Sequence, residues 1–264
     1  MKVDALEAGG SSRLSLRAAG PVWASLAALG GIAWVVTVGQ ARDMGVGPGT
    51  MDMTFPFFLA MWAGMMAAMM LPAIGVQAAG ELAPATSSAT AIRIPRGLAF
   101  GIGFLVPWAA YGALAFAALV GTGRLADSSP GAAKWLGVAM LAAAGIYQLS
   151  PWKLRALRHC RMAMHTGART WLSSGLAAGV RDGGICVGCC WALMATLFAV
   201  GVMNLLAMAG LAAVIFAEKI LPRPRLIAGL AGVAFLGLAV AAAVHPSILS
   251  GLTGSEMAMA VEGM

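Results

Sequence analysis

Three of the four cysteines in this chain lie within five residues, at Cys186, Cys189 and Cys190, at the head of a long apolar run. A helix turns by about 100° per residue, so these three sulfurs face one direction, and Met194 extends that face by one turn. Soft sulfur ligands select Cu(I), and clustered thiolates also suit Zn²⁺. The spacing therefore predicts a soft-metal site, with copper as the leading ion and zinc as the alternative.

A second group of sulfurs is formed by five methionines within ten residues of another apolar segment. They are Met61, Met65, Met66, Met69 and Met70. On a helix the i, i+4 spacing places them on two neighbouring stripes. Neutral thioethers bind Cu(I) more weakly than thiolates do, so we expect Met61, Met65, Met69 and Met194 to be relay or auxiliary ligands, with Met66 and Met70 as weaker candidates. Methionine also fills gaps in apolar cores, and packing is the alternative interpretation.

Three further side chains could extend the cysteine site. His159 and Cys160 lie in a basic segment that precedes the cluster, and Asp182 lies one helical turn before Cys186. We expect them to be weaker ligands or groups that receive the ion, while solvated side chains in a basic loop are the alternative.

Two other functions fit the same cysteines. The Cys186/Cys189 pair has the spacing of a dithiol that cycles with a disulfide, which would suit a membrane thiol redox enzyme. Free cysteine also behaves as a small apolar residue, so the chain could be a non-catalytic assembly or accessory subunit. The sequence contains no phosphate-binding loop of the Walker type and no Ser/His/Asp arrangement, and it gives no other indication of an enzyme.

The composition predicts an all-α, polytopic membrane protein. Apolar residues make up 60% of the 264 residues, charged residues 10%, and the mean hydropathy is +0.86. Soluble domains have about 45–50% apolar and about 25% charged residues. The net charge of +7 comes from basic residues that alternate with the apolar segments, so we expect contact with the lipid bilayer and no binding of nucleic acid.

About seven transmembrane helices are expected, because a span needs about 20 apolar residues. The candidates are 21–41, 55–78, 97–121, 132–150 and 226–245, with two shorter spans made by dividing 185–220 near Gly201 to Asn204. If the N-terminus is cytoplasmic, every Lys and Arg except Arg42, Arg124 and Lys134 also lies on the cytoplasmic side. The C-terminus is then external.

This topology divides the chain into three parts. Residues 1–20 form a flexible cytoplasmic N-terminus, 21–246 a single transmembrane domain, and 247–264 an external tail. Within the domain, 151–184 is a basic cytoplasmic loop in which Trp171 to Arg181 forms an amphipathic interfacial helix. Cleavage of the first apolar segment as a signal peptide is the alternative for the N-terminus.

Few charged residues lie inside the apolar segments. Glu218 and Lys219 are adjacent at the end of one of them, where they predict an ion pair at the membrane interface. No acid lies at the middle of a predicted span, which argues against proton-coupled transport.

Several motifs resemble those of a bacterial family of predicted metal-binding integral membrane proteins of unknown function. They are Met61-Trp62 through Met69-Met70-Leu71-Pro72, Tyr147-Gln148-Leu149-Ser150-Pro151, His159-Cys160-Arg161, Cys186-x-x-Cys189-Cys190-Trp191, Gly201-Val202-Met203-Asn204 and Glu218-Lys219. The resemblance covers the second to the sixth predicted helix. It implies a multi-pass protein of the bacterial inner membrane that binds a metal and works with a metal-receiving or metal-dependent membrane protein. Family members often have a His where this chain has Asp182, and a further Cys near Leu157.

Overall fold

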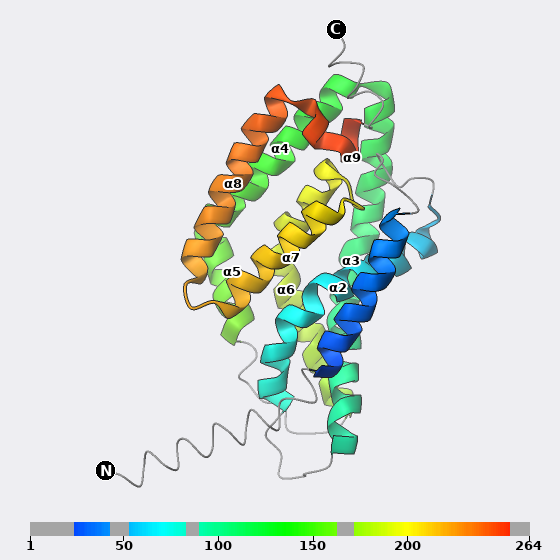
Figure 1. The fold of residues 1–264 in the computed structure, drawn as a ribbon, viewed down its shortest axis with the longest axis vertical. Helices are drawn as coiled ribbons and strands as arrows, with labels where there is room; N and C mark the ends of the chain where they lie inside the picture. The colour runs from blue at the N-terminus through cyan, green and yellow to red at the C-terminus, as the bar shows by residue number, and fades with distance from the viewer. Residues whose placement is uncertain (1–23, 43–52, 83–89, 163–171, 254–264) are drawn as a thin grey trace, which may run out of the picture.

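Every element of the described chain is helical, which confirms the all-α class. The computed structural model describes residues 24–42, 53–82, 90–162 and 172–253 (Figure 1). The elements are an N-terminal helix Ala24–Arg42, α2 Phe55–Leu82, α3 Thr90–Ser128, α4 Pro130–Leu149, α5 Pro151–Met162, α6 Leu172–Val200, α7 Leu205–Ile220, α8 Pro224–Val244, the 3-10 turn η2 Pro246–Leu249 and α9 Ser250–Thr253.

Six of the described helices are long and apolar enough to cross a membrane. Their apolar segments are Ala24–Arg42, Phe55–Ile74, Gly97–Ser128, Pro130–Leu149, Gly175–Val200 and Pro224–Val244. The expected division of 185–220 is present, because α6 ends at Val200 and α7 begins at Leu205. With 16 residues, α7 is about 24 Å long, which is shorter than the ~30 Å of bilayer hydrocarbon.

The break between α6 and α7 is encoded by two residues. Gly201 has a φ of 103°, a left-handed conformation that favours glycine over residues with a Cβ. Asn204 then caps α7, since its side-chain oxygen accepts a hydrogen bond of 3.0 Å from the amide of Ala207. The chain therefore turns within four residues and starts a new helix.

The basic segment 151–184 is more helical than expected. Residues 151–162 form α5, and residues 172–184 are the first turns of α6 instead of a separate interfacial helix. The first residues of the expected tail pack against the bundle: Leu249 and Leu252 are fully buried, and Ser250 Oγ donates a hydrogen bond of 2.7 Å to the carbonyl of Val200. Residues 1–23 and 254–264 lie outside the described part of the chain.

Small residues allow α3 and α6 to pack closely. A Cβ at Gly179 or Gly183 would collide with the backbone of Phe100 or Phe104, respectively. Residue numbers on α3 and α6 therefore increase in the same direction, which means that the two helices run parallel. Close backbone approach through small residues is the usual way in which membrane helices associate.

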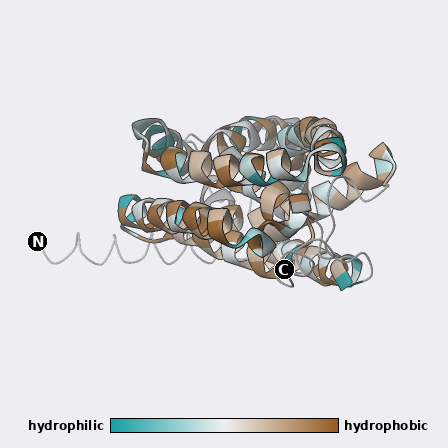
Figure 2. Ribbon diagram, turned by 90° about the horizontal axis from the view of Figure 1, so that it is seen from above, coloured by the Kyte–Doolittle hydropathy of each residue, from teal (hydrophilic) through white to brown (hydrophobic). Residues whose placement is uncertain are grey.

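Helix α2 runs antiparallel to α3. Trp62 Nε1 donates a hydrogen bond of 3.0 Å to the carbonyl of Trp108, while Leu71 lies beside Gly101 farther along. Large apolar side chains on the outer faces of the helices are exposed, including Leu114, Leu230 and Val240. Figure 2 shows hydrophobic residues along most of the helical ribbons. These outer faces are compatible with contact with lipid.

Candidate metal centre

The structure brings together three thiols from two helices. The sulfurs of Cys160 on α5 and of Cys186 and Cys189 on α6 all lie within 4.8 Å of one another. All three cysteines are free and at most 2% exposed. Three convergent soft ligands in an apolar core are a donor set that suits a soft cation.

Cys190 lies at the edge of this group. Its sulfur is 3.2 Å from that of Cys189, and its residue is 1% exposed. This separation is a non-bonded contact, far above the ~2.05 Å of a disulfide. All three clustered cysteines of α6 therefore point into the core, as the helical spacing predicted, but the third partner in the three-thiol group is Cys160.

The backbone that carries the cysteines is held from three neighbouring helices. Tyr111 Oη on α3 donates a hydrogen bond of 3.0 Å to the carbonyl of Trp191, and Tyr147 Oη on α4 donates one of 2.6 Å to that of Gly188. Lys153 Nζ on α5 donates one of 2.8 Å to the carbonyl of Cys189. These contacts fix the position of this turn of α6 and with it the directions of the sulfurs.

One sulfur is in direct contact with a buried ammonium group. Lys219 Nζ on α7 donates a hydrogen bond of 3.0 Å to Cys186 Sγ, and Lys219 is only 2% exposed. The same nitrogen lies 6.0 Å from the centre of the Phe104 ring, at the outer limit of a cation–π contact. An ammonium donor at this distance stabilises the sulfur as a thiolate.

A second buried lysine is neutralised by a carboxylate. Lys153 Nζ lies 2.8 Å from Glu218 Oε2, and Gln148 Nε2 donates a hydrogen bond of 2.6 Å to Glu218 Oε1. Glu218 and Lys219 are 1% and 2% exposed. Glu218 therefore does form an ion pair, but it is buried and its partner is Lys153, whereas Lys219 contacts Cys186. The two neighbours have different partners because adjacent helical residues point in different directions.

Cys160 on α5 faces the sulfur of Cys186 on α6. Its hydrogen bond with Cys186 raises the pKa of the Cys160 thiol to about 11, and burial acts in the same direction.

The methionines of α2 lie at the same depth in the bundle as the cysteines. All five are at most 3% exposed and belong to the same continuous apolar core as the four cysteines. On α2, Trp62 contacts the rings of Tyr111 on α3 and Phe198 on α6. The hydroxyl of Tyr111 in turn bonds to the carbonyl of Trp191, which directly follows Cys190. Trp62 therefore lies at the level of the cysteine turn, by which we mean residues 186–190 of α6. Since α2 runs antiparallel to α3 and α6, Met65 to Met70 extend from Trp62 alongside that turn.

The other expected ligands lie in different surroundings. His159 is exposed, whereas its neighbour Cys160 is buried, and its Nδ1 lies 2.9 Å from the carbonyl oxygen of Arg155. Asp182 is 4% exposed; Arg181 Nε donates a hydrogen bond of 2.9 Å to its Oδ1, and its Oδ2 contacts no donor in the described structure. It is not a member of the three-thiol group. Met194 is fully buried on the cysteine face.

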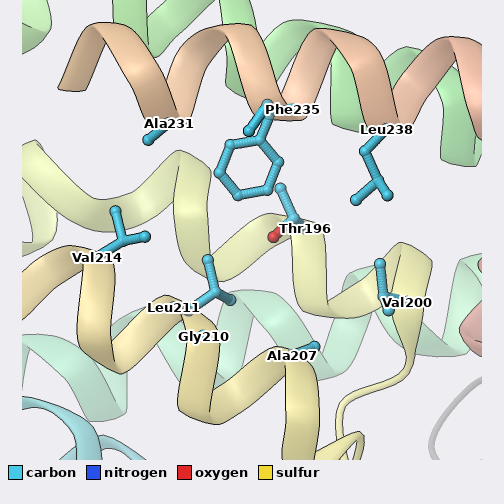
Figure 3. Close-up of a pocket in the computed structure, with 10 residues that line it drawn as sticks. Thr196, Val200, Ala207, Gly210, Leu211, Val214, Ala231, Phe235 and Leu238 are labelled. Atoms are coloured by element: carbon cyan, nitrogen blue, oxygen red, sulfur yellow. The ribbon is translucent and has the colours of Figure 1, made fainter. Parts of the chain in front are cut away.

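An apolar pocket between three helices is separate from the sulfurs. It has a volume of about 310 Å³ and lies between α6, α7 and α8 (Figure 3). Its lining residues are Thr196, Val200, Ala207, Gly210, Leu211, Val214, Ala231, Ala234, Phe235 and Leu238. None of these side chains is a metal ligand of the soft type, so the chemistry of the molecule is concentrated at the cysteine turn.

Sequence reasoning missed both lysines. Lys153 and Lys219 stand next to segment ends, where basic residues ordinarily mark the membrane interface. The available signal was that Lys219 follows an acid, Glu218, at the end of an apolar run. Charged side chains are costly to bury in a membrane, so those found within apolar segments are often functional.

Comparisons with known proteins agree with a site built for a soft ion. Curated proteins and solved structures give no match. A family model described as PpoB2, copper chaperone, matches residues 59–242, which include α3 to α7 whole, most of α2 and α8, and all four cysteines. Because this match covers well over half of the chain, the protein belongs to the PpoB2 copper chaperone family.

Proposed function

We propose that the protein is a multi-pass protein of the bacterial inner membrane that binds Cu(I) and delivers it to a metal-dependent membrane protein. The observation that carries this proposal is the convergence of Cys160, Cys186 and Cys189 within 4.8 Å in a buried core. Thiolates bind Cu(I) strongly, and burial excludes water and competing hard ligands. Membership of a copper chaperone family supports the choice of ion.

Cys160, Cys186 and Cys189 are the proposed tight ligands, and Cys190 is an auxiliary one. Met61, Met65 and Met69, with Met194 on α6, are the proposed relay. The support is their burial in one core with the cysteines and their shared depth in the bundle. A bare ion is very costly to place in hydrocarbon, so an ion that moves through the bundle needs such ligands along its path.

The membrane location rests on six apolar helices and on the distribution of basic residues. The proposed orientation places the N-terminus in the cytoplasm and the C-terminus outside. Labelling of cysteines introduced at positions 10 and 260 in a Cys160→Ser background, in intact cells and in inverted vesicles, tests it. Reaction of both positions from the same side would contradict an odd number of spans.

Metal analysis of the detergent-purified protein tests the function. We expect copper in the wild type after reconstitution with Cu(I), and its loss in a Cys186→Ser/Cys189→Ser variant. Thiol counting on the same samples distinguishes the alternative of a redox enzyme, for which the Cys186/Cys189 pair would cycle to a disulfide without retaining metal.

A further inference from the structure

The two buried lysines beside the cysteine turn have different partners: one pairs with a carboxylate and the other contacts a sulfur. Lys153 and Glu218 form an ion pair of 2.8 Å in which both side chains are at most 1% exposed. Lys219 Nζ contacts Cys186 Sγ at 3.0 Å. The ion pair is neutral by itself, whereas the ammonium of Lys219 contacts a sulfur directly.

A buried site is most stable when its total charge is close to zero, because an uncompensated charge in an apolar core is strongly penalised. The ammonium of Lys219 contacts a sulfur of the proposed site, so it repels any cation that binds there. This repulsion is about twice as large for a divalent ion as for a monovalent one.

We propose that Lys219 is a specificity-determining residue that adjusts the cysteine site to a monovalent soft cation. This inference rests on the proposed function and adds a reason for the choice of ion. Because Lys219 and Cys186 are both buried, water does not screen the repulsion between the ammonium and the bound ion, and a divalent ion carries the larger penalty.

The geometry allows Lys219 to act without leaving its place. A thiolate sulfur has several lone pairs, so Cys186 can accept the hydrogen bond from Lys219 and bind a metal at the same time. Partners that contact ligands in this way commonly change metal affinity by about 10- to 100-fold when they are removed. Lys219 is therefore expected to control selectivity through its charge while the sulfurs hold the ion.

The test compares Ag(I), a monovalent soft ion that air does not oxidise to a divalent state, with Cd(II), a divalent soft ion. Binding of each ion to the purified full-length protein is measured by competition with a chelator, and Cu(I) is measured in parallel. For Lys219→Met we expect the preference for Ag(I) over Cd(II) to fall by about tenfold or more, because the buried positive charge that opposes the divalent ion is removed. Lys219→Arg keeps the charge and should keep most of the preference.

Two further variants separate charge from structure. Lys134→Met removes one positive charge on α4, where Lys134 contacts Trp135, and should leave the preference at the wild-type value. Glu218→Gln removes a negative charge from the network without touching a sulfur, and it should move the preference toward Ag(I). It also gives a second test if Lys219→Met does not fold.

An unchanged preference in Lys219→Met, or equal losses for both ions, would overturn the proposal. So would a shift toward Cd(II) in Glu218→Gln. If the wild type binds none of the soft ions, the proposed function itself fails; if it binds them with the same preference as Lys219→Met, only the role of Lys219 fails.

Discussion

Cys160 and Cys186 lie on different helices, and their sulfurs approach within 4.8 Å although a stretch of chain outside the described residues separates α5 from α6. This contact turns a linear cysteine motif into a three-dimensional site. It requires α5 to fold back against the middle of α6, and the bond from Lys153 on α5 to the carbonyl of Cys189 stabilises that arrangement.

Cys160→Ser is expected to weaken Cu(I) binding by more than tenfold, because it replaces a soft ligand with a hard hydroxyl. Competition with a Cu(I) chelator measures this change. His159→Ala is the matched control, since its exposed side chain points away from the sulfurs and should have little effect. Equal effects of the two substitutions would remove Cys160 from the site.

Cys189→Ser is expected to cost more Cu(I) affinity than Cys190→Ser. Cys189 belongs to the three-thiol group, whereas Cys190 contacts it from the edge. The same chelator competition compares the two neighbours, which are alike in burial and in helix. A larger loss in Cys190→Ser would show that the ion sits on the other side of the cysteine turn.

Asp182→Asn is expected to change Cu(I) affinity by less than tenfold, because a hard carboxylate outside the thiol group is a poor ligand for this ion. The amide keeps the shape of the side chain and supplies a donor or acceptor where Oδ2 has no partner. A loss as large as that of Cys189→Ser would make Asp182 a ligand.

Replacing Met61, Met65 and Met69 together by leucine is expected to slow the loading of Cu(I) while leaving the fold intact. Each Met-to-Leu exchange conserves volume and costs less than about 1.5 kcal/mol. Stopped-flow loading from a Cu(I) donor gives the rate, and thermal unfolding of the same samples gives the stability. Unchanged loading would indicate that these methionines only pack.

Gly183→Ala is expected to destabilise the protein by roughly 1–3 kcal/mol or more, since the new methyl group would collide with the backbone of Phe104. It should also weaken copper retention, because Cys186 lies one turn farther along α6. Gly184→Ala is the control: a Cβ there meets nothing within 4 Å. Thermal unfolding in detergent should separate these neighbours, and equal stabilities would contradict the close packing of α3 and α6.

The sequence predicts the helical class and the common direction of Cys186, Cys189 and Cys190, because both depend on composition and on local periodicity. It also places the division between α6 and α7 at Gly201 to Asn204, where glycine and a capping residue occur together. These features are local, so they can be read without knowing which helices are neighbours.

Other parts of the site depend on contacts between distant segments. The burial of Lys153 and Lys219 follows from the packing of α5 and α7 against α6. The residues that flank Lys153 do not distinguish it from an interfacial lysine, and the only local signal for Lys219 is the adjacent Glu218. The inclusion of Cys160 has the same origin. The continuation of α6 back to Leu172 was missed because its first turns are polar and rich in glycine.

The most direct test of the copper site is the Cu(I) content of the purified wild type beside a Cys160→Ser/Cys186→Ser/Cys189→Ser variant, both shown to be folded by thermal unfolding. The account predicts about one tightly bound Cu(I) per wild-type chain and nearly complete loss in the variant. Equal copper content in the two proteins would contradict it.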